Sequence, residues 1–169
     1  AGAEVVCSGP VLLWYLPGVN MPNPIKIVAI IGSGQMGCGI AHTAALAGFD
    51  VLLSDISAER IEKAIATISG NMARSVSSGK LSEEARTAAL KLIKAAPQLE
   101  DIAGADLVIE AATEDEATKR KIFSAICPIL NPQAILATNT SSISITRLAS
   151  STDRPERFIG IHFMNPVPI

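Results

Sequence analysis

The sequence has few cysteines and little net charge, and each shortage argues against a class of protein. Its 169 residues include three cysteines, Cys7, Cys38 and Cys127, which are widely scattered and never form a C-x-x-C pair. Neither a disulfide framework nor a thiolate metal site is therefore expected, and the predicted setting is a reducing compartment, the cytoplasm. The formal charge of -2 and the pI near 5.7, with no block of like charges, argue against a nucleic-acid partner.

Long apolar runs without interruption are also missing. Residues 5–25 and 27–49 carry no Asp, Glu, Lys or Arg, but prolines break the first stretch and glycines the second, so neither is predicted to span a membrane. No Lys or Arg precedes Lys26, which argues against a targeting signal. Met21 is an alternative start, so residues 1–24 are interpreted as an appendage of uncertain origin and residues 25–169 as one domain.

Short apolar runs alternate with helical patterns from Lys26 onward. The runs at 26–31, 51–54, 106–111, 134–137 and 158–163 have the composition of strands buried on both faces of a parallel sheet. Helical patterns lie between them. The alternation predicts an α/β fold, a Rossmann-like doubly wound sheet that is mainly parallel.

One interval departs from this rhythm. Residues 57–75 and 82–95 are predicted to form two helices joined by a short Ser-Gly-Lys turn. This predicts a helical hairpin inserted after the second strand and standing off the sheet. Two interpretations stay open: a solvated decoration, or a substrate-contacting element, because insertions after a strand's carboxyl end lie beside the ligand crevice of such sheets.

The segment GSGQMG fits the G-x-G-x-x-G pattern of dinucleotide-binding turns. It directly follows the first predicted strand, opens an apolar helix and lies 18 residues before Asp55, which is the context this pattern requires; glycines that serve only a tight turn are the alternative. A carboxylate at Asp55 would bind the ribose hydroxyls and repel a 2′-phosphate, and the following Ile56-Ser57 offers no arginine, so NAD is favoured over NADP. The predicted cofactor-binding residues of this turn are Gly32, Gly34, Gln35, Met36 and Gly37.

Three polar segments follow the ends of later predicted strands, at 110–119, 139–142 and 162–166. Because the carboxyl ends of parallel strands meet at one edge, these segments are expected to converge beside the cofactor. Each has a plain alternative, namely a helix cap, a polar turn and a buried histidine. Their convergence favours a functional site.

Four stretches resemble a known family. GSGQMGCGIA, DLVIEAATEDEATKRKIF, NTSSISIT and RPERFIGIHFMNPVP are similar to the nucleotide-binding domain of the 3-hydroxyacyl-CoA dehydrogenases, including the bacterial 3-hydroxybutyryl-CoA enzymes. The resemblance runs from about Lys26 to Pro168. It implies that a 3-hydroxyacyl-CoA is oxidised to the 3-ketoacyl-CoA with NAD, or the reverse, in fatty-acid metabolism, including β-oxidation.

The resemblance also implies roles for three residues. His162 would be the general acid/base that takes the proton of the 3-hydroxyl group, and an imidazole can accept and return a proton near neutral pH. Ser141 would bond the reacting oxygen and approach the nicotinamide. Asn165 would help to hold both in register.

Binding positions follow from the same resemblance. Glu114 and Lys119 match positions near the nicotinamide ribose, and Arg74 and Lys80 on the hairpin are candidates for the CoA phosphates. No metal is implied.

The resemblance ends with the chain. In this family a glutamate that orients the histidine and an all-helical domain, which closes the acyl site and dimerises, follow NPVP, and neither occurs up to Ile169. The chain is therefore interpreted as the cofactor-binding part of a homodimeric enzyme. Two alternatives are a related NAD-dependent dehydrogenase of free hydroxy acids and a non-catalytic NAD-binding module, which would leave His162 without a purpose.

Overall fold

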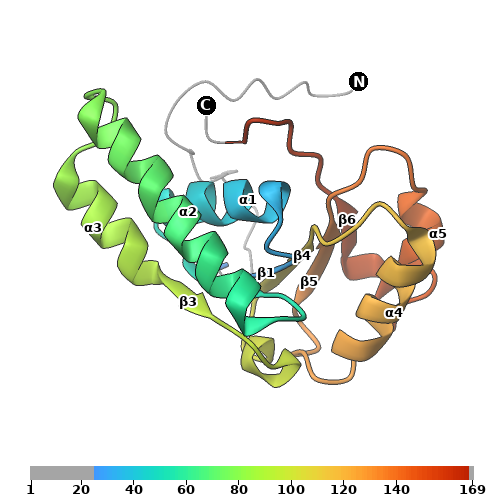
Figure 1. Cartoon of the computed structure of the whole chain (residues 1–169). Coiled ribbons are helices and arrows are strands. Elements are labelled where there is room, and N and C mark those ends of the chain that lie inside the picture. The colour runs from blue at the N-terminus through green and yellow to red at the C-terminus, as the bar shows by residue number, and fades with distance from the viewer. Residues whose placement is uncertain (1–24, 168–169) are drawn as a thin grey trace, which may run out of the picture.

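We describe the protein from a computed structural model of residues 25–167, so the interpretation of residues 1–24 lies outside the described part. A six-stranded sheet carries helices on both faces (Figure 1). The elements in chain order are β1 (Ile27–Ile31), α1 (Gln35–Leu46), β2 (Asp50–Ser54), α2 (Ala58–Ser77), α3 (Glu83–Leu92), β3 (Ile93–Ala95), β4 (Leu107–Glu110), α4 (Glu116–Ile126), β5 (Ile135–Thr138), α5 (Ile145–Ala149) and β6 (Phe158–Gly160), with short 3₁₀ turns at Leu99–Ile102 and Pro155–Arg157.

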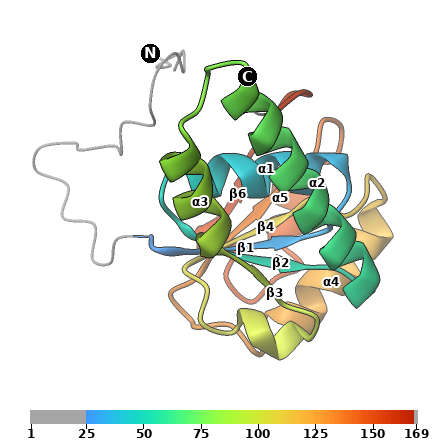
Figure 2. The same cartoon turned by 60° about the vertical axis from the view of Figure 1, so that its left-hand side comes forward.

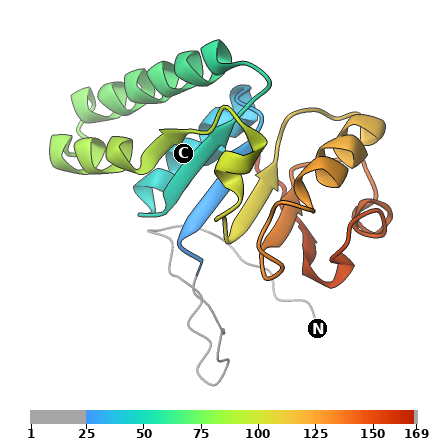
Figure 3. The same ribbon diagram turned by 90° about the horizontal axis from the view of Figure 1, so that it is seen from below.

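The apolar strand residues divide between two cores because successive side chains of a strand point to opposite faces. In β1, Val28 and Ile30 face a core shared with α1, α2 and α3. Ala29 and Ile31 face a second core that includes Phe123 from α4. Figure 3 shows the two helical layers on either side of the strands. Within residues 25–167, no helix is long and apolar enough to cross a membrane.

The strand order is β3-β2-β1-β4-β5-β6, and every neighbouring pair is parallel. This order confirms the predicted Rossmann-like sheet. The chain leaves β1 toward β2 on one side and continues later with β4 on the other, so the crevice between the carboxyl ends of β1 and β4 is the expected ligand site.

Two helices follow β2 as expected, and one face of α2 is buried beside the sheet. The apolar face of α2, with Ile61, Ala64, Ile68 and Met72, is buried in the same core as the strands. The two helices connect β2 to β3 as a crossover, and Figure 2 shows them packed over α1. The buried face of α2 therefore belongs to the core, whereas residues 73–88 of the hairpin are half-buried or exposed.

Candidate functional site

The turn after β1 requires glycine at two of its three fingerprint positions. Gly32 has a φ of +104°, and a Cβ there would lie 2.6 Å from the Cα of Ala112. At Gly37 a Cβ would lie 1.8 Å from the carbonyl oxygen of Gly32, so glycine lets α1 begin directly against the turn. A Cβ at Gly34 would meet no atom within 4 Å. The missing side chain at Gly34 therefore leaves open space for a ligand.

The start of α1 is suited to a phosphate. Gly34 is the N-cap residue and provides no side-chain cap, so the N–H groups of the first turn, including those of Gln35 and Met36, lack helical partners. The first turn also contains no acidic residue. Free N–H groups and the helix dipole together favour an anion. The turn thus fits a dinucleotide pyrophosphate.

Asp55 follows the end of β2 and is held by the turn it faces. Its Oδ2 accepts hydrogen bonds from Ser33 N and Ser33 Oγ, both at 2.8 Å, and its Oδ1 accepts from Ile56 N at 2.8 Å. A carboxylate offers about four acceptor positions, which leaves one on Oδ1. That position can accept a ribose hydroxyl, as the sequence predicted for the adenosine end of NAD.

One positive charge near Asp55 comes from the helix that follows it. Arg60, in the first turn of α2, places Nη1 3.7 Å from Asp55 Oδ1. The two residues after Asp55 contain no arginine, as noted, but the turn into α2 brings the fifth residue back to the carboxylate. Asp55 therefore has a cation near it in space, although none follows it directly in the sequence.

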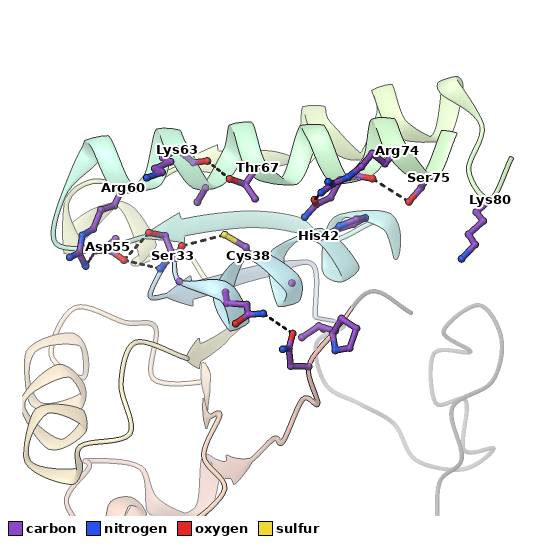
Figure 4. Close-up of a pocket in the computed structure, with 18 of the residues that line it drawn as sticks. Ser33, Cys38, His42, Asp55, Arg60, Lys63, Thr67, Arg74, Ser75 and Lys80 are labelled. Carbon is purple, nitrogen blue, oxygen red and sulfur yellow. Dashed lines mark hydrogen bonds and ion pairs between the residues drawn. The ribbon is translucent and has the colours of Figure 1, made fainter. Parts of the chain in front are cut away.

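A groove of about 900 Å³ runs from Asp55 along α2 (Figure 4). Arg74 and Lys80, the predicted CoA-phosphate residues, line its far end on the hairpin. Arg74 also donates a hydrogen bond to Asn71. Residues 165–167 close the groove on the side of α1. The groove thus joins the predicted adenosine end of the cofactor to the predicted CoA residues.

The loop after β5 is organised by Glu114. Its Oε1 accepts hydrogen bonds from the hydroxyl groups of Thr140, Ser141 and Ser142 and from two backbone N–H groups, at 2.6 to 3.2 Å. Burial by itself would raise the pKa of Glu114, but these hydrogen bonds, with the charge of Lys119, lower it to about 2. Glu114 is thus a fixed anion, and it accepts a hydrogen bond from the Ser141 hydroxyl.

Lys119 lies inside the protein. Its side chain is fully buried and forms an ion pair with Glu110, which is also fully buried. Its Nζ further donates to Thr138 Oγ1 and to the carbonyl of Asn139, at 3.2 and 3.3 Å. These contacts join the ends of β4 and β5 beneath the loop that carries Ser141. The role of Lys119 at the nicotinamide ribose stays a prediction, since Glu110, Thr138 and Asn139 already accept from its three N–H donors.

His162 lies beyond the end of β6 and is exposed. The backbone on either side of it is tied to β5: Ile161 N donates to the Thr138 carbonyl at 3.1 Å, and Phe163 N donates to Asn139 Oδ1 at 2.9 Å. β6 was predicted to reach residue 163, but regular pairing ends at Gly160 because β5 itself ends at Thr138. His162 therefore extends from the sheet edge next to the Ser141 loop.

Asn165 reaches back to the glycine turn. Its Oδ1 accepts a hydrogen bond from Gln35 Nε2 at 3.0 Å, across 130 positions of the sequence. The structure thus pairs Glu114 with Ser141 and Gln35 with Asn165. For His162, the hydrogen bonds to β5 are made by the neighbouring residues Ile161 and Phe163.

The sequence reasoning missed Gly39, where a Cβ would lie 2.7 Å from the Cβ of Val167. An extra glycine two residues after the fingerprint was the available signal.

An all-parallel sheet of this order, with a turn suited to a phosphate and a carboxylate that has a remaining acceptor position at its switch point, is typical of a dinucleotide-binding domain. Residues 27–169 match the family described as 3-hydroxyacyl-CoA dehydrogenase, NAD binding domain. The chain belongs to this family, and the cofactor of its domain is NAD.

Known relatives extend the match. A 3-hydroxybutyryl-CoA dehydrogenase of Bradyrhizobium diazoefficiens is 64% identical over 88% of this chain and 51% of its own length. A 3-hydroxyadipyl-CoA dehydrogenase of Escherichia coli is 46% identical over 86% of this chain and 30% of its own. The crystal structure of (S)-3-hydroxybutyryl-CoA dehydrogenase from Ralstonia eutropha superposes with a TM-score of 0.84 at 44% identity, over 86% of this chain and 52% of that one. The chain thus spans about half, or less, of the length of these relatives.

Proposed function

We propose that this chain is the cofactor-binding part of an NAD-dependent dehydrogenase that oxidises a 3-hydroxyacyl-CoA to the 3-ketoacyl-CoA, or catalyses the reverse. The observation that carries the proposal is the edge formed by the ends of β1, β4, β5 and β6. The phosphate-accepting turn, the Glu114–Ser141 loop and the His162 segment all meet there. NAD, when bound, supplies the acceptor for the hydride that leaves carbon 3 of the substrate.

His162 is the proposed general acid/base. Its exposed imidazole takes the proton of the 3-hydroxyl during oxidation and returns a proton during reduction, for which the side chain is chemically suited near neutral pH. The hydrogen bonds of Ile161 and Phe163 to the end of β5 fix the backbone that carries it. The protein thus positions the imidazole through the sheet.

Ser141 and Asn165 are the proposed positioning groups. The Ser141 hydroxyl donates a hydrogen bond to Glu114 at 3.2 Å. In this proposal the hydroxyl rotates toward the substrate oxygen when the substrate binds. Asn165 is held at the glycine turn by Gln35 and keeps the His162 segment over the cofactor. The second carboxylate oxygen of Glu114 accepts no hydrogen bond within residues 25–167, which suits it to a ribose hydroxyl.

The acyl-CoA is proposed to use the groove along α2. Arg74 and Lys80 supply positive charge for its phosphates. The relatives act on 3-hydroxybutyryl-CoA and 3-hydroxyadipyl-CoA by name, so the substrate class proposed here is a 3-hydroxyacyl-CoA. We further propose a cytoplasmic enzyme of fatty-acid β-oxidation whose whole protein is a homodimer.

The test is an NADH absorbance assay with 3-hydroxybutyryl-CoA on the protein encoded by the complete gene. NADH formation that requires both the CoA thioester and His162 supports the proposal. Equal turnover of free 3-hydroxybutyrate would favour the hydroxy-acid alternative. NAD binding without turnover of either substrate would favour a binding module.

A further inference from the structure

At the adenosine end of the cofactor site, the carboxylate of Asp55 is held by the protein, whereas the guanidinium of Arg60 is largely exposed. The Asp55 side chain is 9% exposed and accepts three hydrogen bonds from the protein, whereas the Arg60 side chain is 66% exposed. Their closest atoms are 3.7 Å apart, longer than a hydrogen bond, and exposed pairs of this kind contribute little energy. The guanidinium of Arg60 is therefore free to turn to another anion.

A second positive charge lies on the same side of α2. Lys63 follows Arg60 by three positions, which places both on one face of the helix, and both line the groove beside Asp55 (Figure 4). Ser57, the N-cap residue of this 20-residue helix, makes no side-chain cap hydrogen bond, so its first N–H groups add to the positive potential. Glu59, in the same turn, is not among the residues that line the groove.

These charges border the place where an adenosine 2′-phosphate would stand. Asp55 offers its remaining acceptor position to a ribose hydroxyl, and a phosphate on that hydroxyl would meet the carboxylate at close range. Arginine forms bidentate hydrogen bonds with phosphate and receives the 2′-phosphate in NADP-binding domains. The structure thus places Arg60, which could bind a 2′-phosphate, next to Asp55, which would repel it.

We propose that Arg60, supported by Lys63, is a latent binding site for the 2′-phosphate of NADP, and that the carboxylate of Asp55 closes it. In the protein as it stands, Asp55 engages the ribose of NAD and its charge repels a phosphate on the same ribose. Once the carboxylate is neutralised, the same arginine receives the phosphate. The inference depends on the NAD site alone and not on the acyl substrate.

Calorimetric titration of NAD and NADP into purified variants of the chain tests the proposal. Asp55→Asn should lower the ratio of the NADP to the NAD dissociation constant by about tenfold or more, since a charge-assisted phosphate contact replaces a repulsion. Adding Arg60→Ala to Asp55→Asn should reverse most of that change. Adding Lys121→Ala, which removes an equal charge on exposed α4 surface, should leave the new ratio intact.

The proposal is overturned if the selectivity ratio is the same in Asp55→Asn with and without Arg60. It is also overturned if Lys121→Ala and Arg60→Ala act alike, because only net charge would then matter. If Asp55→Asn does not fold, which its melting curve reports, the same comparison is made with Asp55→Ser. The NADH assay judges the proposed dehydrogenase activity separately.

Discussion

Glu114 concentrates more hydrogen bonds on one atom than any other side chain of the described site. Five donors from the segment 140–142 surround its Oε1, and the pKa of about 2 follows from these bonds outweighing burial. A group whose pKa is lower in the folded protein than in the unfolded chain stabilises the fold when ionised. This contribution is complete above the ordinary pKa of 4.5 and is lost as the pH falls toward 2.

We therefore expect Glu114→Gln to lower the melting temperature by a few degrees at pH 7, because the amide is a weaker acceptor for the loop. The difference from the wild type should stay constant down to about pH 5. Below that it should shrink, because the unfolded wild-type chain takes up a proton at this carboxylate that the folded protein, with a pKa of about 2, does not. Melting curves of both proteins between pH 7 and pH 3 measure it. A difference that grows on acidification would show that the sign of the linkage is wrong.

The second residue-scale prediction concerns His162. In the protein encoded by the complete gene, His162→Gln should reduce turnover by about 10² to 10⁴-fold, the usual contribution of a general acid/base. NADH affinity should change by less than about twofold, since the imidazole is assigned to the substrate hydroxyl. Steady-state rates and NADH fluorescence titration give the two values. Near-normal kcat would make His162 a structural residue.

At the scale of elements, two glycines at the start of α1 have different roles: Gly34 leaves space for the cofactor, and Gly37 is required by the fold. Gly34→Ala places a methyl group in open space at an extended N-cap, so stability should change little while NAD affinity falls by about tenfold or more, because the pyrophosphate needs that space. Gly37→Ala drives a Cβ against the Gly32 carbonyl and should destabilise the fold by about 1–3 kcal/mol. Melting curves and NAD titrations of both variants test the contrast, and similar stabilities would contradict it.

The buried pair of Glu110 and Lys119 holds the ends of β4 and β5 together. Lys119→Met leaves the Glu110 carboxylate buried without its cation and should cost about 3–5 kcal/mol in the free energy of unfolding. Combining it with Glu110→Gln, which keeps an acceptor for Ala112 N, should restore part of the loss. Urea unfolding of the wild type, both single variants and the double variant gives the coupling. Additive effects would show that the two charges do not depend on each other.

Sequence patterns located the strands where local and tertiary preferences agree. The bounds of β1, β2, β4 and β5 lie within one residue of those expected, since each is a buried apolar run flanked by polar residues or glycine. β3 was missed because Lys94 and Ala95 are good helix formers that continue the pattern of α3, and the segment becomes a strand through its pairing with β2. No pattern within the sequence reports such a distant partner.

In the candidate site, too, the local features were predictable from the sequence and the tertiary contacts were not. The glycine turn and Asp55 form a local fingerprint, so their geometry followed from spacing. The approach of Arg60 to Asp55 and the burial of Lys119 depend on how α2 and α4 leave their strands. From sequence alone, Arg60 in the first turn of a helix and Lys119 in an amphipathic helix are expected to be solvated. Only the tertiary fold places a carboxylate beside each of them.

At the scale of the whole molecule, the last described segment ties the two ends of the fold together. Residues 165–167 cross the start of α1, where Asn165 bonds Gln35 and Val167 occupies the space left by Gly39. His162 and Met164 precede this crossing and are exposed, Met164 to 76%. The proposed acid/base therefore faces solvent in this chain.

We expect the 169-residue chain to bind NAD but to oxidise 3-hydroxybutyryl-CoA at least ~100-fold more slowly than a protein of the relatives' full length, because the exposed imidazole of His162 is open to water. The exposed apolar side chains of Ile159 and Met164 should also promote self-association. NADH assays of both proteins, calorimetric NAD titration and sedimentation velocity measure these properties. Turnover by the 169-residue chain within about tenfold of the longer protein would place the complete catalytic apparatus inside these residues, since a misplaced catalytic group alone costs more than that.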